Sequence, residues 1–194
     1  MNLDYEVWSV HADYHNYPVL YIKNEADFHR LVDAGKWGGW SGISIAHAWT
    51  DSIDLSVDRD HPSEELPDLV LLSVGAPSFA MRAETADLVR SYFGHCGEFL
   101  PARVDERIGE QWVVFHLLTR RAVADWTKSR RLDPLGQPHK LVFFQERLSR
   151  GDLLLEDEYP YFWLTVEPDG FKAFAKTHKL SGLVFNKEFP VEQD

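Results

Sequence analysis

The stretch LVLLSVGAPSFAMRAETADLVRSYFG, residues 69–94, decides the fold that the sequence predicts. Residues 69–74 form the most continuous apolar run of the chain, and such a run predicts a strand that is buried on both faces. Beyond Pro77, apolar residues recur at the spacing of one helix face: Phe79, Ala83, Ala86, Val89 and Phe93. We therefore expect a strand, followed by a helix that begins at Ser78 and packs on the sheet.

The same order of apolar run, polar residue or proline, and short amphipathic stretch occurs twice more. Residues 19–23 are followed by Asn24, whose side chain suits the position just before a helix. Residues 161–166 lead into a last amphipathic stretch, which opens at Pro168 and ends at Gly182. Each copy predicts strand, helix and strand. Because the copies match only in pattern, we interpret them as the ordinary order of mixed α/β chains rather than as an internal repeat.

Further strands are predicted by alternating, β-branched or aromatic runs. These runs are residues 5–10, 43–49, part of 51–68, 98–104, 111–119, 140–145, 153–155 and 183–185. The polar residues 105–110 are few enough to join their flanking strands as a hairpin, whereas residues 122–131 predict a short helix or irregular structure. We therefore expect an α+β fold: a mixed, largely antiparallel sheet with about three short helices packed on it, in a single domain over residues 1–194.

The composition indicates a folded, acidic protein. The 194 residues include 31 acidic side chains against 20 lysines and arginines, which gives a formal net charge of −11. The resulting negative potential repels phosphate backbones and favours cationic partners, so we do not expect nucleic-acid binding. Solubility alone is the alternative explanation of this charge.

Cysteine content and hydropathy favour a cytoplasmic location. Cys96 is the only cysteine, so an intrachain disulfide is impossible, and a reducing compartment is expected. Residues 1–6 lack the basic and apolar regions of a secretory signal. No run approaches the roughly 18 apolar residues of a membrane span, so we expect no membrane partner.

Residues 51–68 are an acidic segment. They contain seven acidic residues and a single cationic one, Arg59, and two prolines among them predict an exposed loop after a short strand. Trp37 and Trp40 lie shortly before this segment in a glycine-rich stretch, and Trp49 adjoins it. Tryptophan among acids is typical of a protein-binding hot spot that faces a basic partner. For each tryptophan taken singly, however, a position in the hydrophobic core is more common than an exposed one.

The sequence contains no recognisable catalytic motif. His11, His15, Asp58 and His61 are possible ligands for a metal ion, which leaves a metal-dependent hydrolase as an alternative function. The pair His95-Cys96 could form a thiolate, but adjacent side chains rarely face each other, and we expect this cysteine to be a small core or loop residue. There is no Gly-x-Ser-x-Gly motif and no glycine-rich phosphate loop. The sequence therefore predicts no enzyme, no cofactor and no metal site.

Four motifs follow one another in the last two thirds of the chain. They are Leu72-Ser73 ahead of the expected helix at Ser78, GEFLPARV at residues 97–104, WVVFHLL at residues 112–118 and KLSGLVF at residues 179–185. Over residues 71–189 this order resembles a family of bacterial polymorphic-toxin immunity proteins, which are small cytoplasmic proteins encoded beside a secreted toxin. The resemblance implies a stoichiometric inhibitor that binds its cognate toxin and blocks the active site or an essential movement.

An acidic surface agrees with this implied function. A toxin that acts on nucleic acid or nucleotides presents a basic cleft, which an acidic loop can occupy as a phosphate mimic. The expected partner-binding residues are Trp37, Trp40, Asp54, Asp58, Asp60, Glu64 and Glu65. A second acidic cluster is the competing interface: Glu156, Asp157 and Glu158. Besides the hydrolase, a regulatory module that binds small molecules in an aromatic pocket remains an alternative function.

Overall fold

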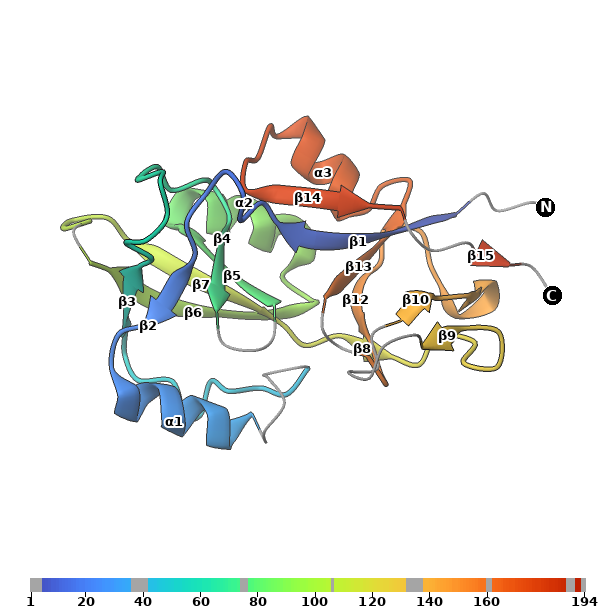
Figure 1. Ribbon diagram of the computed structural model, residues 1–194, viewed down its shortest axis with the longest axis horizontal. Helices are drawn as coiled ribbons and strands as arrows, with labels where there is room; N and C mark the ends of the chain where they lie inside the picture. The colour runs from blue at the N-terminus through green and yellow to red at the C-terminus, as the bar shows by residue number, and fades with distance from the viewer. Residues whose placement is uncertain are drawn as a thin grey trace.

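The structure is a computed structural model that describes residues 5–35, 42–73, 77–105, 107–131, 138–159, 162–187 and 191–192. It confirms an α+β fold with mixed sheets and short helices. Most strands belong either to a closed barrel, on the left of Figure 1, or to a five-stranded sheet beside it. The sequence did not predict the barrel closure.

The barrel has the strand order β2-β3-β6-β7-β5-β4. Its strands are β2 (Leu20–Ile22), β3 (Ile53–Val57), β4 (Val70–Ser73), β5 (Pro77–Arg82), β6 (Gly97–Val104) and β7 (Trp112–Leu117). β6 and β7 form the predicted antiparallel hairpin, and the pairs β2–β4 and β3–β6 are parallel. Side chains alternate along each strand, so Trp112 and Val114 of β7 fill the barrel, whereas Val113 and Phe115 pack in a second core outside it.

The five-stranded sheet has the order β14-β1-β13-β12-β8. Its strands are β1 (Glu6–Ala12), β8 (Arg120–Arg121), β12 (Leu153–Glu156), β13 (Trp163–Glu167) and β14 (Leu183–Asn186). Neighbours in this sheet are antiparallel except for β12 and β8. Trp163 of the sheet meets Phe79 and Phe115 of the barrel at ring-centroid distances of 4.7 and 5.3 Å. The second core therefore joins the barrel to the sheet.

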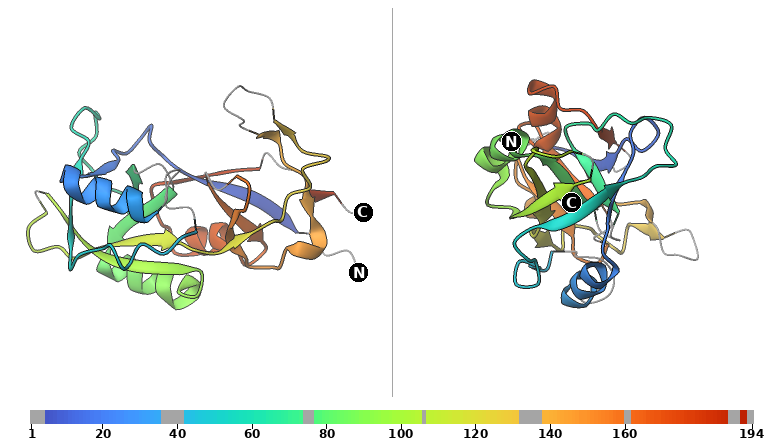
Figure 2. Two further views of the ribbon diagram at one scale, coloured as in Figure 1. Left: turned by 90° about the horizontal axis from the view of Figure 1, so that it is seen from below. Right: turned by 90° about the vertical axis from the view of Figure 1, so that its left-hand side faces the viewer.

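The first helix, α1 (Glu25–Ala34), begins as predicted after Asn24. The side-chain oxygen of Asn24 accepts the backbone N–H groups of Ala26 and Asp27 at 2.8 and 3.4 Å. Only Leu31 of this helix is buried. The helix lies on the opposite side of the barrel from α3 (Figures 1 and 2).

The other two α-helices of the described residues, α2 (Ala83–Phe93) and α3 (Phe171–Thr177), pack on each other. The ring centroids of Phe93 and Phe171 lie 5.2 Å apart within the second core. Shorter elements complete the fold: β9 (Arg130–Arg131), β10 (Pro138–Lys140), β11 (Phe143–Phe144), β15 (Val191–Glu192) and the 3-10 helix η1 (Gln145–Arg147). Within the described residues, no helix has the length and apolar character needed to cross a membrane.

Several predicted elements are wrong or differ in extent. The helix expected from Ser78 begins at Ala83, because residues 77–82 form β5, which pairs with β4 on one edge and β7 on the other. Phe79 lies four residues before Ala83 and so matched a helix face, but it is a strand residue of the second core. The strand expected at residues 43–49 is wrong, since residues 42–52 of the structure contain turns. Of the three expected strand–helix–strand units, β13, α3 and β14 keep the predicted order.

Candidate functional site

The acidic loop, residues 58–65, follows β3 at the left end of the molecule in Figure 1. Asp58 Oδ1 accepts the N–H of Asp60 at 3.1 Å. His61 Nδ1 accepts the N–H of Ser63 at 3.0 Å, and Ser63 Oγ in turn accepts the N–H of Glu65 at 3.2 Å. Three successive turns of the loop are thus fixed by its own side chains, so that the loop presents its remaining groups in a defined arrangement.

The hairpin tip, residues 105 and 107–110 between β6 and β7, lies beside the acidic loop. Arg107 Nη2 donates to the carbonyl oxygen of Glu64 at 3.1 Å, which fastens the loop to the tip. Lys23 pairs with Asp105 at 2.8 Å, and that carboxylate raises the pKa of Lys23. At the end of the tip, the side chain of Ile108 is 100% exposed. The loop and the tip therefore form one continuous surface.

Two hollows flank Arg107 in this surface. Their volumes are about 540 and 650 Å³, and Glu64 and Arg107 line both of them. The remaining lining is mainly polar or charged, with Asp58, His61 and Asp105 in the first hollow. No tryptophan, tyrosine or phenylalanine among the described residues lines either hollow. The hollows suit charged, hydrated groups better than they suit the ligand of an aromatic pocket.

Ion pairs neutralise part of the predicted acidic surface. Asp54 lies on β3 and pairs with Arg103 of β6 at 2.7 Å, and this carboxylate raises the pKa of Arg103. Four carboxylates of the acidic loop form no ion pair with the described residues: Asp58, Asp60, Glu64 and Glu65. The structure thus places these four predicted site residues in one loop, whereas Asp54 lies on β3 and pairs with Arg103.

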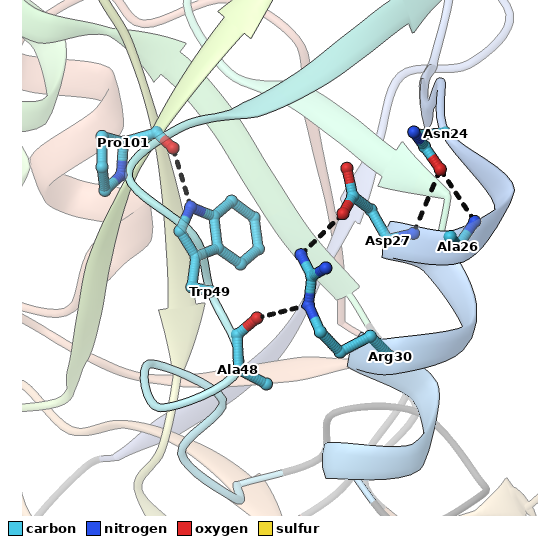
Figure 3. Close-up of polar contacts among 7 residues, drawn as sticks. All are labelled: Asn24, Ala26, Asp27, Arg30, Ala48, Trp49 and Pro101. Carbon is cyan, nitrogen blue, oxygen red and sulfur yellow. Dashed lines mark hydrogen bonds and ion pairs between the residues drawn. The ribbon is translucent and has the colours of Figure 1, made fainter.

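Of the three tryptophans near the acidic segment, the structure describes Trp49. Trp37 and Trp40 lie outside the described residues. Trp49 is 9% exposed, and its Nε1–H donates to the carbonyl oxygen of Pro101 at 2.7 Å (Figure 3). Trp49 is therefore a core residue.

The competing cluster at residues 156–158 requires a correction. Glu156 is 0% exposed, and its Oε2 accepts the N–H groups of Glu158 and Tyr159 at 2.7 and 2.9 Å. Burial raises the pKa of the Glu156 carboxyl. This side chain fixes a turn and cannot contact a partner, which reduces the candidate interface to Asp157, paired with Arg120 at 3.0 Å, and Glu158.

The histidines of the metal hypothesis do not converge. His11 Nε2 lies 2.7 Å from Ser9 Oγ on β1, His15 packs against Tyr14, and His61 belongs to the acidic loop. In the part of the chain that the structure describes, no three histidine, cysteine, aspartate or glutamate side chains are arranged to hold a metal ion. The geometry thus offers no support for the hydrolase.

The described residues contain two pairs of a nucleophile and a histidine. Contrary to expectation, Cys96 Sγ does lie 3.3 Å from Nε2 of His95, but the thiol is buried, the first of the two places expected for it, and burial raises its pKa. Sequence analysis missed the second pair, in which Ser78 Oγ lies 3.2 Å from His116 Nδ1. Ser78 and His116 are at most 1% exposed, so a substrate cannot reach either of them. The hydrogen bond between Ser78 and His116 joins β5 to β7 and has a structural role.

Sequence analysis also missed Arg107 and Ile108. Both lie in a turn that was recognised only as a hairpin connection. A lone isoleucine in a polar turn is a signal that could have been used, because an apolar side chain there has no core to enter. The contact of Arg107 with the carbonyl of Glu64 joins positions 43 residues apart and leaves no pattern in the sequence.

No protein-family model matches the chain, and no curated protein matches its sequence. The acidic loop and the hairpin tip therefore have to be interpreted from their own geometry and charge.

Proposed function

We propose that this protein is an immunity protein, which binds a bacterial toxin through the acidic loop and the hairpin tip and neutralises it by stoichiometric contact. The observation that carries the proposal is a preorganised loop with four carboxylates that form no ion pair with the described residues, next to a hairpin tip that carries the fully exposed Ile108. The order of motifs over residues 71–189, which resembles immunity proteins, supplies the kind of partner.

The physical argument rests on what such a surface gains on binding. Carboxylates that form no ion pair with the described residues can pair with lysine and arginine of another protein, and their potential raises the association rate. A loop fixed by its own hydrogen bonds loses less conformational entropy when it binds. Ile108, at the end of the hairpin tip, adds an apolar side chain that a partner can bury.

The proposal implies that the protein inhibits the toxin by staying bound to it and does not convert a substrate. The protein acts from the cytoplasm, where a toxin that enters the cell would meet it. The partner presents a basic surface, and we expect an interface of ordinary size, roughly 1,600 Å² in total.

Co-expression with the product of the adjacent reading frame tests this function. We expect the wild-type protein to restore growth of cells that express that product and to elute with it as a one-to-one complex. A neighbouring product that is harmless, or one that is toxic and forms no complex with this chain, contradicts the proposal.

A charge reversal at the loop locates the binding surface. Asp60→Lys with Glu65→Lys reverses two carboxylates and keeps the backbone N–H groups that fix the loop. Glu84→Lys with Asp87→Lys makes the same change in net charge on the exposed face of α2. We expect the loop variant to lose growth rescue and the helix variant to keep it.

A further inference from the structure

The segment around α3 carries a charge opposite to that of the whole protein. Residues 170–187 contain four of the eight lysines of the chain and no aspartate or glutamate, although the net charge of the chain is −11. Three of these lysines lie on α3 or in the turn after it: Lys172, Lys176 and Lys179. These three residues are called the lysine face below.

The cations of the lysine face form no ion pair with the described residues. Lys172 and Lys176 are one helical turn apart, so they share one side of α3, and the N–H of Lys179 continues the turn by donating to the carbonyl oxygen of Lys176 at 3.2 Å. Lys176 and Lys179 are exposed. Lys172 Nζ lies over the ring of Trp8, 2.9 Å from its centroid, and so has an aromatic ring beside it but no carboxylate paired with it.

An exposed aromatic ring borders the lysine face. Tyr92 of α2 is 56% exposed, and its ring centroid lies 4.9 Å from that of Phe174 and 5.8 Å from that of His178, the residue before Lys179. The lysine face therefore combines cations with exposed aromatic surface. The acidic loop and the hairpin tip offer the complementary groups, since they combine carboxylates with the exposed side chain of Ile108.

The lysine face and the acidic loop are neighbours on the molecular surface. Asp68, shortly after the acidic loop, accepts the hydroxyl of Ser181 at 2.7 Å, and Ser181 lies two residues after Lys179. Ser181 also lines the larger hollow together with Glu64 and Glu65 of the acidic loop. One side of the molecule thus carries both signs of charge, in two adjacent areas.

We propose that the chain forms a two-fold dimer in which the acidic loop of each copy binds the lysine face of the other. Charge complementarity carries the proposal, because three lysines and four carboxylates lack ion pairs with the described residues of their own copy. The exposed side chains of Tyr92 and Ile108 add apolar area to the contact. Both surfaces belong to this chain, so the dimer does not depend on a toxin. A partner that binds the acidic loop displaces the second copy.

Two-fold symmetry follows from the adjacent position of the two areas. When two copies face each other through this side, each acidic loop meets the other copy's lysine face, and both contacts form at once. A closed dimer of this kind leaves neither area free to add a third copy. The net charge of −11 repels the copies from each other, but salt at about 0.15 M screens charges that lie more than about 8 Å apart and affects the contacts within the interface less.

Sedimentation velocity of the wild-type chain, from micromolar to millimolar concentration, tests the dimer. At about 0.15 M NaCl we expect the mass to rise with concentration and to level off at twice the mass of one chain. In about 1 M NaCl the dissociation constant should rise about tenfold or more, because the screening length falls to about 3 Å. A chain that stays monomeric, a mass that rises beyond the dimer, or a dimer that salt does not weaken overturns the proposal.

Charge reversal tests which surfaces meet. Lys176→Glu with Lys179→Glu reverses the lysine face, and Asp60→Lys with Glu65→Lys reverses the acidic loop. Each pair of substitutions places like charges in both contacts and should weaken the dimer about tenfold or more. A dimer that survives either reversal overturns the proposal.

A chain with all four substitutions is the matched control, because it has the net charge of the wild type and opposite charges in both contacts. We expect it to dimerise within about threefold of the wild-type dissociation constant. Mixing the two singly reversed chains creates the same complementarity between different chains, so a heterodimer should form even where the fourfold variant does not fold. Absence of that heterodimer, or a folded fourfold variant that stays monomeric, overturns the proposal.

Discussion

Asp68 and Ser181, which lie 113 positions apart in the chain, bind each other through three hydrogen bonds. The carboxylate of Asp68 accepts both the hydroxyl and the N–H of Ser181, at 2.7 and 2.8 Å, and the hydroxyl oxygen accepts the N–H of Asp68 at 3.0 Å. The N–H of Leu69 continues the contact to the Ser181 carbonyl at 3.2 Å. This clamp fixes the chain between the acidic loop and β4 to the turn that follows α3.

Removing the Ser181 hydroxyl should weaken the clamp. Ser181→Ala deletes one donor and one acceptor and leaves the Asp68 carboxylate with the N–H of residue 181 alone. We expect a loss of about 1–3 kcal/mol in the free energy of unfolding, measured by urea denaturation. Ser149→Ala is the control: it keeps the backbone N–H that donates to Asp152 and should stay within about 0.5 kcal/mol of wild type. Equal stability of the two variants would show that the clamp contributes little.

Gly182, the next residue, should tolerate no side chain. Its φ is +93°, and a Cβ there would lie 2.1 Å from the carbonyl oxygen of Leu69. Gly109 at the hairpin tip has a similar φ of +90° and nothing within 4 Å of such a Cβ. We expect Gly109→Ala to cost about 1–2 kcal/mol from backbone strain, and Gly182→Ala to cost about 3 kcal/mol or more because a steric clash is added. Thermal unfolding of both variants separates backbone strain from the steric clash. Similar losses of stability in the two variants would contradict the predicted clash with the Leu69 carbonyl oxygen.

The raised pKa of Glu156 predicts a pH dependence of stability. Because burial raises the pKa of this carboxyl in the folded chain, its contribution is complete below the ordinary carboxyl range and is lost as the pH rises through the folded-state value. Glu156→Gln cannot titrate, so its stability relative to wild type should increase between pH 5 and pH 8. Glu158→Gln, at an exposed neighbour, should show a smaller increase, because the charge of Glu158 is only a minor cause of the raised pKa of Glu156. A relative stability of Glu156→Gln that is constant over this range would contradict the prediction.

The sequence predicted local elements more reliably than their pairing. Asn24 marks the start of α1, and the hairpin of β6 and β7 was recognised, because capping and turn chemistry depend on neighbouring residues. The region around Phe79 was misread because an interval of four residues to Ala83 fits a helix, whereas β5 forms through pairing with β4 and β7. Barrel closure depends on the contact of Leu20 with Leu72, which no local pattern encodes.

The same limit applies to the candidate site. Composition located the acidic loop, since charge and proline content are local properties. It could not show that Arg103 pairs with Asp54, that Glu156 is buried, or that Arg107 holds the loop, because each depends on a distant partner or on burial. Charge clusters are therefore better guides to the region of a site than to its residues.

Ile108 should matter for binding and not for folding. Its side chain is 100% exposed, so Ile108→Ser should leave the melting temperature unchanged and weaken the complex with the product of the adjacent reading frame about tenfold. Val184→Ser, at another exposed apolar residue on β14, should leave the affinity unchanged. Calorimetric titration measures both. Wild-type affinity in Ile108→Ser would remove the hairpin tip from the proposed surface.

The association rate with the product of the adjacent reading frame tests the central claim most directly. At low salt, Asp60→Lys with Glu65→Lys should associate about tenfold or more slowly than wild type and show a flatter salt dependence, because the loop carboxylates, which form no ion pair with the described residues, would attract the proposed basic partner. The matched reversal on α2, Glu84→Lys with Asp87→Lys, should stay within about twofold of wild type. Equal slowing in the two variants, or none in the loop variant, would contradict the account.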